Sequence, residues 1–148
     1  MTINKLLSNF QSLDTDKVAI ESITETSMQR VELNREQLGN GLRSDGSEIL
    51  PSYSPYTVQI KKLKGQESRF VTVKDTGAFW AGIRSDVNGL RIIDYSTDPK
   101  SDKLKKKYET SKGKLTGLNQ DSKNEYIVKD LRPVFNNKIS KLTGLKFK

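Results

Sequence analysis

The tripeptide Asp75-Thr76-Gly77 is the place in the sequence where residue types and their order most suggest catalysis. Aspartic proteases use such a turn and hold two aspartates around one shared proton, so that the pair serves as both acid and base. A chain with a single motif of this kind would need to dimerise to bring two copies of Asp75 together. An aspartic protease is therefore one hypothesis for this chain.

The sequence around the tripeptide argues against that hypothesis. Lys74 occupies the position before the aspartate, where an apolar residue would be expected. The second motif of such half-enzymes, two apolar residues followed by glycine, is missing, because Ile92 and Ile93 are followed by Asp94. We interpret Asp75 instead as the cap of a short helix that follows the turn.

The composition further limits the reactions that this chain could catalyse and the metals that it could bind. The 148 residues include no histidine and no cysteine. Histidine is the usual side chain for acid–base chemistry near neutral pH and the commonest metal ligand, and cysteine supplies thiolate nucleophiles and zinc ligands. Asp94 and Asp98 are too weak a pattern to indicate a metal site. We predict a non-enzymatic protein with no catalytic residue, no metal site and no cofactor.

Phe79 and Trp80 follow the tripeptide in a chain with few aromatic residues and one tryptophan. A lone tryptophan usually packs in a core, but aromatic residues are also enriched at the centres of subunit interfaces. We predict that Asp75, Thr76 and Gly77 form a turn that positions Phe79 and Trp80 for one of these two roles.

Positive charge is concentrated in the C-terminal third of the chain. The net charge is +8; from residue 100 onward 14 lysines and arginines stand against 5 acidic residues, whereas 12 stand against 13 before it. The densest cluster contains Lys103, Lys105, Lys106 and Lys107. Such a cluster is either a solvated helix face or a surface that contacts DNA or an acidic partner.

Residues after Asp14, which can cap a helix, follow a helical pattern. Members of one stripe recur at intervals of three and four: Ile20, Ile23, Ser27, Val31, Asn34 and Leu38. The stripe predicts one long helix over about 14–39, preceded by a short helical or irregular piece. Because two of its members are polar, we expect this helix to pack on a sheet or on a neighbouring subunit.

The next segment, 40–54, is rich in turn-forming residues and predicts an exposed loop. Ser54 and Pro55 then signal the start of a short helix, which Gly65 ends. Its lysines Lys61, Lys62 and Lys64 could contact phosphate, but on a short helix they are more often a solvated face, so we expect them to be solvated.

Three β-branched runs predict a small antiparallel sheet. They occupy residues 70–74, 82–87 and 90–95. Asn88-Gly89, between the last two runs, is the strongest short signal for a hairpin. The central helix and the sheet together occupy about 55–97.

The C-terminal part, about 101–144, is predicted to be helical. Ser101 or Asp102 can cap a lysine-rich helix, and Ser122 can open a last helix that Pro133 bends or interrupts. We therefore predict a single α+β domain with a long N-terminal helix, a small antiparallel sheet and C-terminal helices.

The order of these pieces resembles that of tailed-phage virion-morphogenesis, tail-completion or neck proteins. Members share a long N-terminal helix, a loop with an Asp-Gly step, a turn before a lysine-rich helix, and a strand that ends in Asp-Thr-Gly before an aromatic residue. The corresponding segments are Asp45-Gly46, Tyr53-Ser54-Pro55-Tyr56-Thr57, Lys61-Lys62-Leu63-Lys64-Gly65, Val71-Thr72-Val73, Asp75-Thr76-Gly77-Ala78-Phe79 and the closing Leu131-Arg132-Pro133-Val134-Phe135.

This resemblance implies a structural virion protein, made in the host cytoplasm, that assembles as a ring at the junction of portal and tail. Its implied partners are copies of itself and portal, neck or tail proteins, with non-specific contact to packaged DNA and no membrane. The sequence is compatible with this, since it has no signal-peptide-like or membrane-spanning apolar run. The alternative is a basic nucleic-acid-binding protein of phage or mobile-element origin.

Overall fold

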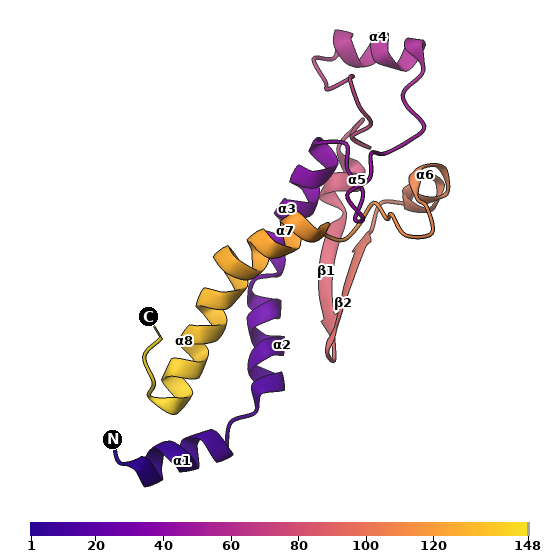
Figure 1. Cartoon of the computed structure of the whole chain (residues 1–148). Helices are drawn as coiled ribbons and strands as arrows, with labels where there is room; N and C mark the ends of the chain where they lie inside the picture. Colours follow the sequence, from indigo (N-terminus) through magenta and orange to yellow (C-terminus); the bar gives the residue numbers. More distant parts are fainter. Residues whose placement is uncertain (148) are drawn as a thin grey trace.

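The computed structural model describes residues 1–147 and has an elongated shape with both termini at one end (Figure 1). Its elements in chain order are α1 (Ile3–Gln11), α2 (Thr15–Glu25), α3 (Ser27–Gly39), α4 (Pro55–Leu63), α5 (Ala78–Ala81), β1 (Ile83–Asn88), β2 (Arg91–Ser96), α6 (Ser101–Tyr108), α7 (Gln120–Glu125), the π-helix η1 (Tyr126–Leu131) and α8 (Arg132–Thr143). The predicted α+β class is confirmed.

Two helical arms and one hairpin make up the framework (Figure 1). Helices α2 and α3 form the first arm, and α7, η1 and α8 form a second arm that runs back beside it. The β1–β2 hairpin packs against α3, while α4 and α6 lie away from the termini. None of the helices within residues 1–147 has the length and apolarity needed to cross a membrane.

The prediction of one long helix over 14–39 is wrong, because the helix is interrupted at Thr26. The hydroxyl of Ser22 donates to Val18 O at 2.6 Å, and the hydroxyl of Thr26 lies 2.8 Å from Ser22 O. Such bonds from a side chain back to the preceding turn favour helix bending. The predicted start is confirmed, since Asp14 Oδ1 accepts from Lys17 N at 3.0 Å.

The hairpin prediction is confirmed with a shift of one residue. Strands β1 and β2 pair antiparallel from Ile83 with Ser96 to Asn88 with Arg91, so the two loop residues are Gly89 and Leu90. Gly89 has φ +60°, and a positive φ at the first loop position is what tight hairpin turns require.

The predicted strand over 70–74 is wrong, because this segment pairs with no strand in the described part of the chain. Side chains replace a neighbouring strand as its partners: Tyr53 Oη accepts from Thr72 N at 3.1 Å, and Trp80 Nε1 donates to Thr72 O at 2.9 Å. Val73 then takes φ +55°, a conformation that costs a β-branched residue about 1–3 kcal/mol and turns the chain out of an extended path.

The last helix is interrupted as expected before Pro133. Six residues of π-helix precede α8, in which Pro133 occupies the first turn. Proline lacks an N–H and its ring crowds the carbonyl four residues earlier, and a π-helical segment is one way a helix accommodates such a break. Asn119 caps α7 in place of the predicted Ser122, with Oδ1 accepting from Ser122 N at 2.9 Å.

The loop over 40–54 is less exposed than predicted. Arg43 is buried, and its guanidinium donates to the carbonyls of Tyr108, Glu48 and Leu50 at 2.7, 2.6 and 2.9 Å. Buried carbonyls need donors, so one arginine satisfies the backbone of both this loop and the end of α6. The loop is therefore held against the C-terminal part.

The apolar core lies between α3, the hairpin and the loops around α5 and α6. It consists of Val31, Leu38, Ile49, Val71, Val73, Phe79, Ile83, Tyr108 and Leu115. The loops thus supply many of the core residues. This explains how a chain with 33% hydrophobic residues still closes a core.

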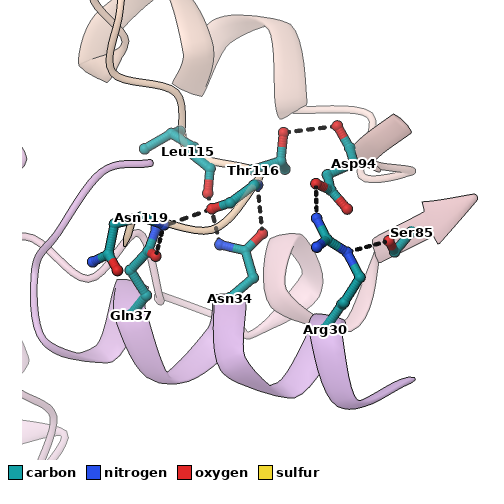
Figure 2. A network of polar contacts seen from close by, with 9 residues as sticks. Arg30, Asn34, Gln37, Ser85, Asp94, Leu115, Thr116 and Asn119 are labelled. Carbon is teal, nitrogen blue, oxygen red and sulfur yellow. Dashed lines mark hydrogen bonds and ion pairs between the residues drawn. The ribbon is translucent and has the colours of Figure 1, made fainter. Parts of the chain in front are cut away.

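A buried polar network fastens α3 to the hairpin and to the loop before α7 (Figure 2). Arg30 donates to Ser85 Oγ at 3.2 Å and pairs with Asp94 at 2.8 Å. Asn34 donates to Leu115 O at 3.1 Å and accepts from Gly117 N at 3.0 Å. Asn34 is one of the two polar residues in the predicted stripe, and its amide holds the loop before α7 in place.

Gln37 extends this network by one helical turn (Figure 2). Its amide donates to Gly117 O at 3.0 Å and accepts from Asn119 N at 2.7 Å. Asn34 and Gln37 thus bond the loop backbone much as a neighbouring strand would. The position of α7, and of the arm that continues it, depends on these bonds.

Candidate functional site

A cleft of about 400 Å³ lies between α4, the segment 73–78, and α6. Its floor is apolar and aromatic, with Tyr53, Ile60, Val73, Phe79, Leu104 and Tyr108, and its charged residues are Lys61, Lys64, Lys74, Lys100, Asp75 and Asp98. An apolar hollow with a few convergent polar groups is the usual form of a binding site. The structure therefore brings the Asp-Thr-Gly tripeptide together with the basic helix α4.

The tripeptide forms a turn, but Asp75 does not cap the helix that follows. Gly77, with φ +87°, occupies the cap position of α5, and Thr76 Oγ1 accepts from Ala78 N at 3.3 Å. Asp75 is turned outward with its side chain 70% exposed and pairs with Lys64 at 3.0 Å. The predicted cap is therefore wrong, since the carboxylate binds a lysine instead.

The electrostatics of Asp75 are determined mainly by Lys64. The hydrogen bond and the positive charge of Lys64 lower the pKa of the Asp75 carboxyl. An exposed aspartate that is kept ionised by a lysine acts as a fixed negative charge.

Phe79 and Trp80 both contact the apolar core but are buried to different extents. The Phe79 side chain is buried in the core of its own chain. Trp80 is half-buried; its Nε1 holds Thr72 O, and the ammonium of Lys74 lies 4.7 Å from the centre of its ring. Trp80 therefore fixes the segment that forms one wall of the cleft.

Lys61 is the residue of the cleft that the sequence did not indicate. It was expected to be solvated, but it is only 5% exposed. Its ammonium donates to Lys74 O at 2.6 Å and to Gln66 Oε1 at 3.2 Å, and lies 4.8 Å from the ring centre of Tyr53. Neutral oxygens and an aromatic face hold this charge, so its positive field acts on the cleft.

The lysine cluster of α6 lies outside the lining of the cleft. Leu104 and Tyr108 of α6 face inward, which places the four lysines Lys103, Lys105, Lys106 and Lys107 around the rest of the helix. None of the four forms an ion pair within residues 1–147. Neither predicted cap begins α6: Lys100 takes the cap position, and Asp98 accepts from Lys100 N at 3.0 Å.

The fold and the site define an α+β chain with a basic, aromatic-floored cleft. Within residues 1–147, no group of three or more acidic side chains is placed to hold a metal ion. Comparison of the chain with protein-family models, with curated proteins and with solved structures found no match.

Proposed function

We propose that this chain is a structural virion protein of a tailed phage, which assembles as a ring at the neck or tail, where portal and tail meet. Its partners are further copies of itself and the adjoining portal, neck or tail proteins. The proposal rests on the order of segments that resembles tail-completion and neck proteins, and on one structural observation, the exposed apolar face of helix α1.

Helix α1 has a strongly apolar face and buries no residue. Ile3, Leu7 and Phe10 follow at intervals of four and three, and are 76%, 55% and 43% exposed. A hydrogen bond from Asn9 Nδ2 to Thr143 O at 3.4 Å joins α1 to the end of α8. A helix of nine residues is marginal in water by itself, so an apolar face of this kind favours contact with another subunit.

The two helical arms offer a further apolar surface. An open groove between α2 and the η1–α8 arm is lined by Ala19, Ile23, Ile127, Leu131 and Phe135. Two uncovered apolar surfaces on a chain with its own closed core support a role in assembly.

The role of α1 is tested by placing charge on its apolar face. We expect Leu7→Glu with Phe10→Glu to leave the melting temperature within about 4 °C, because two exposed substitutions together change stability by only about 1 kcal/mol. The same variant should remain monomeric in light scattering and form no rings in electron micrographs. The matched control Ser8→Glu adds charge on the opposite face and should assemble normally. Unimpaired ring formation by the double variant would remove α1 from the interface.

A second candidate function, a nucleic-acid-binding protein, is favoured by the lysines that α4 and α6 carry on either side of the cleft. Under the leading proposal, DNA contact is non-specific and weak, with a Kd of about 1 μM or above at physiological salt. Binding of duplex DNA to the isolated monomer, titrated over salt concentration, separates the two functions. Nanomolar binding that weakens steeply with salt, and that Lys103→Glu with Lys106→Glu abolishes, would make DNA binding the primary role.

A further inference from the structure

The outward face of α3 carries an acidic stripe that contrasts with the cleft. Met28, Glu32 and Glu36 follow at intervals of four, so they lie on one side of the helix, and all three are exposed, Met28 by 58%. Asp130 of η1 lies beside them, in an open groove of about 350 Å³. The stripe therefore presents one flexible apolar side chain next to three carboxylates, of which Glu32 is paired with Arg35 at 2.6 Å.

The cleft has the complementary character. Lys64, Lys74 and Lys100 are exposed at its rim, and the buried ammonium of Lys61 adds positive charge from beneath, so lysines outnumber the two carboxylates of the cleft, Asp75 and Asp98. The floor between them is apolar. Thioether side chains adapt readily to irregular apolar hollows, and opposite charges around such a contact fix its orientation.

We propose that the cleft of one copy receives the α3 face of the next copy in the ring. Met28 enters the apolar floor, and Glu36 pairs with Lys100 on the rim. Glu32 and Lys64 exchange their partners within the chain, Arg35 and Asp75, for each other. This inference rests on the proposed ring assembly and assigns to it a particular contact.

The placement of the two surfaces suits a ring. In Figure 1, α3 and α6 lie on opposite sides of α5, and none of Met28, Glu32 and Glu36 lines the cleft, so the acidic face and the cleft are different surfaces. A contact between two different surfaces of identical chains is heterologous, and repetition of such a contact generates rings. A symmetric dimer would instead need one self-complementary patch.

Charge reversal in two variants tests this contact. Variant A carries Lys64→Glu and Lys100→Glu, and variant B carries Glu32→Lys and Glu36→Lys. Each variant alone should associate at least about tenfold more weakly than wild type. In an equimolar mixture, each cleft meets a face of opposite charge, so association measured by light scattering should return. The control Lys103→Glu with Lys106→Glu makes the same charge change outside the cleft and should assemble as wild type does.

Cross-linking locates the contact directly, because the chain has no cysteine of its own. A chain with Met28→Cys is mixed with a chain with Tyr56→Cys at the cleft, and a short bis-thiol reagent is added. A covalent heterodimer is expected, while Gln11→Cys in place of Met28→Cys should give little.

The outcomes separate this contact from the ring itself. If wild type forms rings but the mixture of A and B stays dissociated, the contact is overturned and the ring proposal stands. If variant A loses DNA binding and the mixture still fails to associate, the cleft is a nucleic-acid site and the contact is again overturned. If wild type is monomeric at every concentration tested, both the contact and the ring proposal fail.

Discussion

Replacement of Arg30 by methionine should lower the free energy of unfolding by about 3–5 kcal/mol, which is the cost of leaving a buried charge without its partner. Arg30 is buried, pairs with Asp94 at 2.8 Å and lies 5.2 Å from the ring centre of Tyr126. Methionine fills much of the same volume, so the loss arises from the unpaired Asp94 carboxylate. Thermal unfolding followed by circular dichroism should show a melting temperature lower by roughly 10 °C.

The double variant Arg30→Met with Asp94→Leu separates charge from packing. When both members of a buried ion pair become apolar, stability is often retained or improved. We therefore expect the double variant to recover most of the loss. A double variant as unstable as Arg30→Met alone would show that packing against Ser85 and Tyr126, rather than the orphaned charge, explains the effect.

Replacement of Asn34 by leucine should have an effect of similar size. The side chain keeps its volume but can no longer bond Leu115 O and Gly117 N, which it reaches at 3.1 and 3.0 Å. Each buried backbone group left without a partner costs about 1–3 kcal/mol. Denaturant unfolding should therefore give a free energy of unfolding lower by about 2–6 kcal/mol.

The matched control for Asn34 is Gln29→Leu on the exposed side of the same helix, which should change stability by less than about 0.5 kcal/mol. Hydrogen exchange gives a second readout, because the amides of Gly117 and Asn119 should lose protection in the Asn34→Leu protein before the core does. Equal stability of Asn34→Leu and Gln29→Leu would mean that water replaces the lost bonds.

The network and the proposed contact use opposite sides of α3. Arg30, Asn34 and Gln37 bind the chain's own hairpin and loop, whereas Met28 and Glu32 face outward. A helix that is fixed on one side in this way presents the other side with little conformational freedom to lose on binding.

Much of the local structure follows from the sequence alone. Asp14 and Ser54 begin helices because their side chains accept a backbone N–H of the first turn, and Gly144 ends α8 with a positive φ. The hairpin follows from two β-branched runs around a glycine. These features depend on interactions within a few residues, and such short-range chemistry is directly visible in the order of residue types.

The incorrect predictions concern segments whose secondary structure depends on contacts with distant parts of the chain. The β-branched run at 70–74 satisfies its backbone partly with Tyr53 and Trp80 instead of a strand. The helix over 14–39 bends at Thr26, whose hydroxyl also lies 2.6 Å from Tyr126 Oη on the returning arm. Propensity is a weak determinant wherever tertiary contacts offer an alternative partner.

The candidate site, too, was predictable from the sequence only in part. Residue types alone revealed the Asp-Thr-Gly turn, the nearby aromatic pair and a surplus of lysine. Only the tertiary structure placed α4 and α6 on two sides of one cleft, buried Lys61 beneath it and turned Asp75 outward to Lys64. The physical reason is that burial and charge pairing depend on distances between residues far apart in the chain, and the sequence does not contain those distances.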